Sequence, residues 1–323
     1  MEIVVTYPIF EKKKKKEELV KKCVNSGIDS FRMNLSKLDT NDVDIISDNF
    51  ELIRKIGQKS KIIIDIPYPK SRKRVSLKKS SNLIKKDERI NIFNQEDKDY
   101  YIQIDDFRKY FYKDKIYYYA DGEGAFIAKK VLKNFVELKS VNEFCMRTNK
   151  TITTEIININ GDGYNYIEIV NRFMPDEVWL SFTENLKEIQ HFVENGNGRT
   201  KIIAKIESRY GISNLHNFIK QVDGVAVARG DLGLSVPIEN LWSEQEKIIE
   251  CAKLYNKKVY VATGILTSMK ENLIPCRADV IDLSVMCKSK VDGIMLNVKN
   301  TYSDNLEKIV ELVNNINKLY MSS

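Results

Sequence analysis

The sequence predicts an α/β protein, a (β/α)8 TIM barrel with a small antiparallel β domain inserted after the third strand. Eight short apolar runs, most of them rich in β-branched residues, alternate with helical patterns, and one segment of different character interrupts them. Eight such units are the number that closes a (β/α)8 barrel. An open doubly wound sheet is the alternative, but it rarely needs eight units, and no Gly-x-Gly-x-x-Gly follows the first run.

The predicted strands are short apolar runs that end in polar residues or turns. In chain order they are Glu2–Tyr7, Ser30–Leu35, Lys61–Ile66, Glu177–Phe182, Lys201–Ile206, Gly224–Ala228, Lys258–Thr263 and Asp292–Asn297. Between them, apolar residues three and four positions apart predict helices, as for Leu19, Val20 and Cys23 in the first helix. The helix over 243–257 opens with Ser243 and Glu246, whose spacing predicts a capping box.

The interruption lies between the third and fourth strands and divides the chain into two domains. We expect residues 1–69 and 154–323 to form the barrel and residues 70–153 to form the inserted β domain. Aromatic and charged residues alternate in the insert, and Asp-Gly pairs mark turns, as in antiparallel hairpins. A segment inserted at the carboxyl end of a barrel strand can close over an active site, so we expect it to act as a lid.

Composition narrows the classes of function and of metal site. The net charge of +7 suggests an anionic partner, but the lysine run at 12–16 is typical of a solvated helix face, so nucleic-acid binding is disfavoured. The five cysteines show no Cys-x-x-Cys spacing and only two histidines are present, which disfavours zinc and leaves carboxylates as metal ligands. Without an apolar run of 18 residues or an apolar signal core, we expect a cytoplasmic protein without a membrane partner.

Polar residues recur at the carboxyl ends of the predicted strands, where (β/α)8 enzymes carry their active sites. In strand order they are Thr6, Pro8, Arg32, Asn34, Ser36, Asp65, Ser181, Lys205, Glu207, the Ala-Arg-Gly-Asp corner at 228–231, Thr263 and Asn297. Glu207 and Asp231 follow adjacent strands, and two hard carboxylate ligands with open positions suit Mg²⁺ or Mn²⁺. Ion pairing of these carboxylates with Lys205 and Arg229 is the alternative.

The Ala-Arg-Gly-Asp corner also suits a substrate carboxylate. Gly230 allows a sharp turn, and the first N–H groups of a following helical turn can accept an anion. Lys205 would then stabilise a transferring phosphoryl group or an enolate, and Thr263 could give or orient a proton. Arg32 and Arg72 are candidates to hold a phosphate.

These segments resemble the pyruvate kinase family. The resemblance is carried by "KIIAKIES", "DGVAVARGDLG", "VYVATGILTSM" and "PCRADVIDL", and also by "FRMNLS" and "IDIPYPKSRKR". It covers the barrel, extends weakly into the insert, and implies the barrel and lid domains of that family. It also implies a 2-oxo acid or enol phosphate as the substrate and a nucleotide as a partner, and it leaves a homo-oligomer open.

The resemblance implies a role for each matching residue. Glu207 and Asp231 would bind the divalent metal, Lys205 would lie at the phosphoryl group, and Thr263 beside the methyl-bearing carbon. The remaining matches are the carboxylate cradle (Ala228, Arg229, Gly230), phosphate or nucleotide contacts (Arg32, Arg72, Pro8, Lys150) and the positions around a monovalent ion (Asn34, Ser36, Asp65). Lys70 stands where potassium-dependent members carry a glutamate, so we expect its ammonium to replace potassium and no K⁺ requirement.

The chain departs from the family pattern near the nucleotide. Lys37 replaces a histidine, "PYP" replaces a glycine-rich step, and "NVKNTYSD" stands where the family has "SGETA". The resemblance also ends with the eighth barrel helix, so we expect the family's C-terminal regulatory domain, and control by sugar phosphates in its usual form, to be absent.

Three hypotheses of function remain from the sequence. The first is phosphoryl transfer between phosphoenolpyruvate, or a related 2-oxo acid, and a nucleotide through an enolate. The second is a metal-dependent aldolase or lyase that uses the same metal and cradle. The third is a non-catalytic protein that binds a metabolite or nucleic acid.

Overall fold

The structure, a computed structural model, describes residues 1–38, 41–67, 72–148, 150–153 and 166–321. The chain divides into two compact units, Met1–Pro67 with Gly163–Ser323, and Tyr68–Asp162. No helix in the described part of the chain is long and apolar enough to cross a bilayer.

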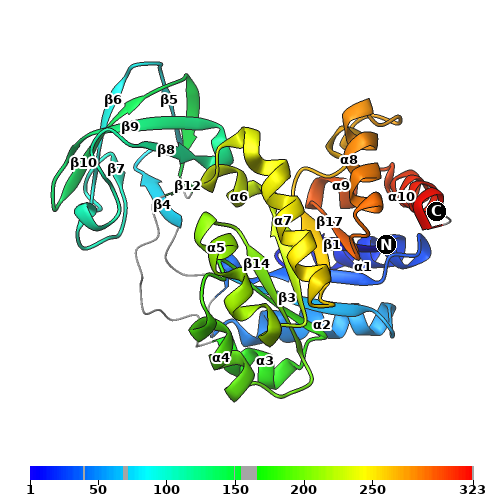
Figure 1. Cartoon of the computed structure of the whole chain (residues 1–323). Helices are drawn as coiled ribbons and strands as arrows, with labels where there is room; N and C mark the ends of the chain where they lie inside the picture. Colours follow the sequence, from blue (N-terminus) through cyan, green and yellow to red (C-terminus); the bar gives the residue numbers. More distant parts are fainter. Residues whose placement is uncertain (39–40, 68–71, 149, 154–165, 322–323) are drawn as a thin grey trace. The chain divides into compact units, whose positions relative to one another are not determined.

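The first unit is a closed barrel of eight parallel strands surrounded by helices (Figure 1), which confirms the predicted fold class. The strands are β1 (Glu2–Tyr7), β2 (Ser30–Asn34), β3 (Lys61–Ile66), β13 (Glu177–Leu180), β14 (Lys201–Ile206), β15 (Gly224–Ala228), β16 (Lys258–Ala262) and β17 (Gly293–Leu296). They follow one another around the barrel in chain order, with β17 closing on β1.

Four strands (β2, β13, β16 and β17) end one or two residues earlier than the sequence predicts, and the backbone explains the cases of β13 and β16. Phe182 has a φ of 49° and Thr263 a φ of 75°, and neither angle is compatible with an extended strand. The strand pairing therefore stops at Leu180 in β13 and at Ala262 in β16.

The helices between the strands cover the outside of the barrel. They are α1 (Lys13–Asn25), α2 (Val43–Ile56), α3 (Ile167–Phe173), α4 (Leu186–Asn195), α5 (Arg209–Phe218), α6 (Arg229–Ser235), α7 (Leu241–Leu254), α8 (Arg277–Lys288), α9 (Val298–Tyr302) and α10 (Leu306–Met321). Short 3₁₀ turns are η1 (Leu35–Lys37), η5 (Ile219–Gln221), η6 (Ile238–Asn240) and η7 (Thr267–Lys270). Leu19, Val20 and Cys23 are buried on α1, as their spacing predicts.

The predicted capping box at the start of α7 is wrong. The helix begins two residues earlier, at Leu241, because η6 leads directly into it. Ser243 therefore lies inside the first turn, where its hydroxyl donates to the carbonyl of Asn240. Glu246 instead accepts a hydrogen bond from Ser289, the residue that follows α8.

Alternate strand residues face the inside of the barrel and define its layers. Val4, Ile63, Trp179, Ile203, Ala226 and Tyr260 form a buried apolar cluster of their own. Their neighbours along each strand, such as Ile62 and Ile64, belong to the larger cluster between the strands and the helices. Because side chains alternate across a strand, the residues two positions before and after the inner cluster also face inward.

The second unit is a β domain with its own core. Its strands are β4 (Arg72–Leu77), β5 (Ser81–Ile84), β6 (Arg89–Phe93), β7 (Tyr100–Tyr101), β8 (Ile116–Tyr119), β9 (Gly124–Val131), β10 (Phe135–Ser140), β11 (Phe144–Arg147) and β12 (Lys150–Thr153), with 3₁₀ turns η2 (Phe107–Lys109) and η3 (Ala120–Gly122). Seven strands close a second barrel and β5 pairs with β11. The pairs are antiparallel except for that of β6 with β7. That this unit acts as a lid stays a prediction.

Candidate active site

Inward-facing residues above the apolar cluster form a polar layer at the carboxyl ends of the strands. Asp65 follows Ile63 by two positions on β3, and Lys205 follows Ile203 by two positions on β14. Ser181 and Glu207 lie just past the ends of β13 and β14 in the same alternation. The period of the strands therefore brings together side chains that are far apart in the sequence.

The centre of this layer is a network around Lys205, here called the Lys205 cluster (Arg32, Asp65, Ser181, Lys205 and Glu207). The Nζ of Lys205 lies 3.1 Å from Asp65 Oδ2, 3.1 Å from Glu207 Oε1 and 2.9 Å from Ser181 Oγ. Arg32 donates from Nε to Asp65 Oδ2 over 2.8 Å, and Ser181 donates to Asp65 Oδ1 over 3.0 Å. The four charged members are all at least 90% buried, so each charge depends on its neighbours.

Asp65 is the better satisfied of the two carboxylates in the cluster. Burial alone would raise the pKa of Asp65, but the positive charges of Arg32 and Lys205 outweigh it and lower the pKa below its usual value. The pKa of Lys205 is likewise raised, because Asp65 and Glu207 together outweigh the effect of burial. Lys205 is therefore a buried cation held in place by two carboxylates.

Glu207 behaves in the opposite way. Burial raises its pKa to about 7, and the negative charges of Asp231 and Asp65 act in the same direction. Lys205 and the backbone N–H of Phe182, which donates to Glu207 Oε2 over 2.6 Å, offset only part of this shift. The protein thus keeps a buried carboxylate whose negative charge its own cations do not fully balance.

A second group of residues lies around Arg229 at the start of α6. Arg229 donates from both terminal nitrogens to Asp282 on α8, over 2.7 and 2.9 Å. Its Nε donates to the carbonyl of Thr263 over 2.9 Å. The side chain therefore ties α6, the end of β16 and α8 together, and it pairs with Asp282 rather than with the metal-ligand candidates Glu207 and Asp231.

The first turn of α6 lies against Thr263. A Cβ added to Gly230 would lie 3.1 Å from Thr263 Cγ2, which is closer than ordinary contact, so glycine permits this approach. Ala228 precedes the helix without a side-chain capping bond, and the first N–H groups of a helix have no partner within it. Asp231 in the same turn is well placed for the positive end of the helix dipole.

Left-handed backbone conformations gather at this end of the barrel. Thr263 and Phe182 have positive φ, as does Leu266 at 48°, and a β-branched residue such as Thr263 rarely adopts this angle. Such conformations cost about 1–3 kcal/mol each and concentrate at functional sites. A cavity of 400 Å³ opens here, with Arg229, Gly230, Thr263 and Asp282 in its lining.

Glu207 and Asp231 fit a hard divalent cation that needs few protein ligands. The described residues contain no group of three or more His, Cys, Asp or Glu side chains able to hold a metal. Mg²⁺ is commonly bound by one or two carboxylates, with water and substrate oxygens completing its shell. The raised pKa of Glu207 beside Asp231 indicates a place where an added positive charge would be stabilised.

Other predicted site residues lie at the carboxyl ends of β1 and β2 or belong to the second unit. Asn34 accepts a hydrogen bond from the backbone N–H of Ser36 over 2.9 Å, and Pro8 directly follows β1. Arg72 and Lys150 are the first residues of β4 and β12 in the second unit. Lys70 lies outside the described residues.

Asp282 is a site residue that the sequence reasoning missed. It belongs to the segment "PCRADVIDL", but nothing in its spacing assigns it to Arg229, which lies 53 positions earlier. Thr6 also gains a contact, because Arg32 lies 3.3 Å from its hydroxyl. In the sequence, the position of Thr6 near the end of the first predicted strand was the signal that could have indicated this contact.

Comparisons with known proteins show which family this chain resembles. The family model described as "Pyruvate kinase, barrel domain" matches residues 2–304. A pyruvate kinase of Borreliella burgdorferi is 28% identical over 317 residues, which cover 93% of this chain and 65% of that protein. A pyruvate kinase of Thermococcus litoralis is 26% identical and covers 94% and 66%, and one of Methanocaldococcus jannaschii is 36% identical and covers 43% and 32%.

The chain thus spans at most about two thirds of the length of these relatives, 66% in the longest of the three matches. The family model, in contrast, extends over nearly the whole of this chain. The protein therefore belongs to the pyruvate kinase family.

Proposed function

We propose that this protein is a pyruvate kinase-like phosphotransferase. It would move a phosphoryl group between phosphoenolpyruvate, or a related enol phosphate, and ADP through an enolate, with Mg²⁺ or Mn²⁺. The observation that carries the proposal is the buried Lys205, held by Asp65 and Glu207 at the barrel mouth. Phosphoryl transfer needs positive charge at the transferring group more than covalent chemistry, and the buried cations Lys205 and Arg32 would supply it together with a divalent metal.

Glu207 and Asp231 would hold the divalent metal in this proposal. The metal would supply charge neutralisation to the enolate and phosphoryl oxygens. Glu207 keeps acceptor capacity for it, because each carboxylate oxygen has two lone pairs and each is used once, by Lys205 and by Phe182. Asp65 would hold Lys205 and Arg32 in position, so that both cations face the phosphoryl group.

The turn at Ala228, Arg229 and Gly230 would receive the substrate carboxylate on its backbone N–H groups. The side chain of Arg229 would hold this turn in place and would not bind the substrate, because it already donates to Asp282 and to the carbonyl of Thr263. The hydroxyl of Thr263 would deliver or orient the proton for the enolate carbon, because the first turn of α6 packs against this side chain.

Several further contacts belong to the same proposal. Arg32, Arg72, Pro8 and Lys150 would contact phosphate or nucleotide. Asn34, Ser36 and Asp65 would surround the position of a monovalent ion, with the ammonium of Lys70 in its place. The enzyme would then work without K⁺.

The decisive experiment measures pyruvate and ATP formation from phosphoenolpyruvate and ADP, with Mg²⁺ and without K⁺. Lys205→Met should abolish turnover, whereas Lys247→Met on the exposed face of α7 should leave it unchanged. Oxalate with Mn²⁺ should raise the unfolding temperature of the unaltered chain but not of Asp231→Asn. No nucleotide turnover, together with retro-aldol cleavage that needs only the metal, would refute the proposal in favour of an aldolase.

A further inference from the structure

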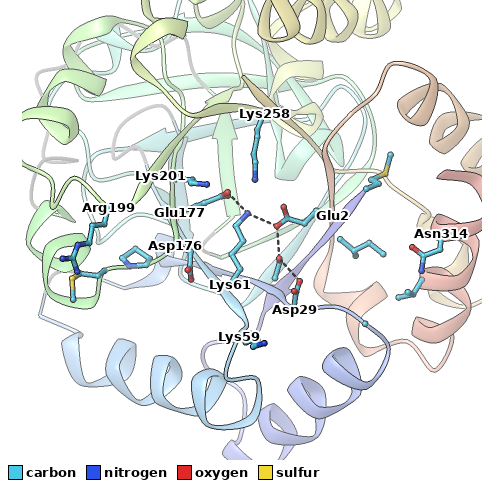
Figure 2. Close-up of a pocket in the computed structure, with 17 residues that line it drawn as sticks. Glu2, Asp29, Lys59, Lys61, Asp176, Glu177, Arg199, Lys201, Lys258 and Asn314 are labelled. Carbon is cyan, nitrogen blue, oxygen red and sulfur yellow. Dashed lines mark hydrogen bonds and ion pairs between the residues drawn. The ribbon is translucent and has the colours of Figure 1, made fainter. Parts of the chain in front are cut away.

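The opposite, amino-terminal mouth of the barrel contains a cavity of 830 Å³ (Figure 2). Its floor is a charged layer formed by inward-facing residues two positions before the apolar cluster. This layer consists of Glu2, Ser30, Lys61, Glu177, Lys201 and Lys258. The apolar cluster, including Trp179 and Tyr260, separates it from the Lys205 cluster.

The carboxylates of this layer are satisfied from within it. Lys61 Nζ lies 2.8 Å from Glu2 Oε1 and 2.5 Å from Glu177 Oε1. The hydroxyl of Tyr260 is 3.0 Å from Glu2 and from Glu177, and the indole N–H of Trp179 donates to Glu177 over 3.0 Å. Burial alone would raise the pKa of Glu2, but Lys61, Ser30 and Tyr260 lower it.

Apart from Lys61, the cations at this mouth are not satisfied in this way. Across the part of the chain that the structure describes, Lys201 and Lys258 pair with no carboxylate, and neither do Lys59 and Arg199 at the cavity wall. Asp176, which also lines the cavity, is paired with Arg54 over 2.8 Å. In Figure 2 the ammonium of Lys258 points toward the Glu2–Lys61–Glu177 group.

Two strands of the barrel, β15 and β17, contribute no side chain to this layer. The corresponding inward positions on β15 and β17 are Gly224 and Gly293, which place no side chain in the layer. A Cβ at Gly293 would lie 2.6 Å from the ring of Tyr260, and one at Gly224 would lie 2.8 Å from the carbonyl of Lys258. No ordinary side chain can therefore replace these glycines without displacing the floor.

We propose that this cavity binds a compact polyanion, a small phosphorylated molecule, through Lys201 and Lys258. These lysines begin strands on either side of β15, about 10 Å apart at two strand spacings, so two flexible side chains can meet on one anion. The volume lies within the range of about 300–1,000 Å³ that is usual for small-molecule sites. A phosphate carries close to two negative charges at neutral pH and suits ammonium groups in a concave site.

Calorimetric titration of the full chain with inorganic pyrophosphate, in EDTA, tests the proposal. Lys201→Gln with Lys258→Gln should weaken binding at least tenfold, as expected when charge-assisted contacts are lost. Lys21→Gln with Lys288→Gln removes the same charge from exposed faces of α1 and α8 and should leave binding unchanged. Arg32→Gln should also bind pyrophosphate normally, since it alters only the active site.

Lys201→Arg with Lys258→Arg should restore binding, which separates loss of charge from loss of fold. Citrate should bind more weakly than pyrophosphate if phosphate is the preferred group. The proposal is overturned if pyrophosphate binding survives the double glutamine change, if Arg32→Gln abolishes it, or if citrate binds equally well.

Discussion

Replacing Glu207 by glutamine should make the metal-free protein more stable above neutral pH. Burial raises the pKa of Glu207 from 4.5 to about 7, so the ionised side chain is disfavoured in the folded state. At 1.36 kcal/mol for each pKa unit, the shift corresponds to about 3 kcal/mol above pH 7. Glutamine has nearly the same shape and no charge, but its amide needs partners, so we expect a gain of about 1–3 kcal/mol.

The raised pKa of Glu207 also determines how the stability difference between the two proteins varies with pH. A carboxyl group whose pKa is higher in the folded protein contributes stability that is fully present below 4.5 and is lost as the pH rises to about 7. The advantage of Glu207→Gln should therefore be largest near pH 8 and should vanish near pH 5, at which Glu207 is protonated in the fold. Asp65 has a lowered pKa and remains in both proteins, so its contribution largely cancels.

Urea unfolding in EDTA, followed by tryptophan fluorescence, measures the difference. Both tryptophans, Trp179 and Trp242, lie in the barrel unit, so the signal reports that unit alone. Glu250→Gln on the exposed face of α7 is the matched control and should change stability by less than about 0.5 kcal/mol. Mn²⁺ should stabilise the unaltered chain and not Glu207→Gln. Lower stability of Glu207→Gln at pH 8 would show that Glu207 is a net stabiliser and would refute the reasoning.

Three further substitutions separate positioning, proton transfer and stability. Asp282→Asn weakens the paired contact with Arg229, so kcat/KM for phosphoenolpyruvate should fall about tenfold to a hundredfold. The circular dichroism spectrum should stay unchanged. Unchanged kinetics would count against a positioning role for Asp282. Thr263→Val removes the hydroxyl, and exchange of the pyruvate methyl protons, followed by NMR, should slow about a hundredfold; a normal exchange rate would exclude Thr263 from proton transfer. Tyr260→Phe removes a hydroxyl that contacts Lys61, Glu2 and Glu177. The free energy of unfolding in urea should therefore fall by about 1–3 kcal/mol, with KM unchanged. An unchanged unfolding midpoint would contradict this account.

The periodicity of the sequence was sufficient to predict the barrel and the order of its strands. Most strands are short runs rich in β-branched residues, and burial on both faces makes such runs stand out from the amphipathic helices. The strand ends were harder to predict, because Phe182 and Thr263 adopt left-handed backbone angles that their residue types disfavour. Local propensity carries no signal for a conformation that the surrounding structure imposes.

The candidate site also combines features that the sequence predicts with features that it does not. Alternation along the strands was enough to predict that Lys205 and Asp65 lie at the carboxyl ends of their strands, because both positions are fixed by strand period, but their ion pair was not predicted. The pairing of Arg229 with Asp282 could not be predicted in this way, since it depends on where α8 packs beside α6. The same applies to Glu207, whose raised pKa reflects the balance of burial and four neighbouring groups rather than its position in the sequence.

The two polar layers of the barrel differ in which charge they leave unbalanced. At the amino-terminal mouth, Lys61 and Tyr260 satisfy both carboxylates, and Lys201 and Lys258 remain as excess positive charge. At the carboxyl-terminal mouth, Asp65 engages both cations of the Lys205 cluster, which leaves Glu207 with excess negative charge. A layer with surplus cations is suited to an anion, and a layer with a surplus carboxylate is suited to a metal ion. Because the apolar cluster separates the layers, ligands of opposite charge can occupy the two ends of one barrel without competing for the same groups.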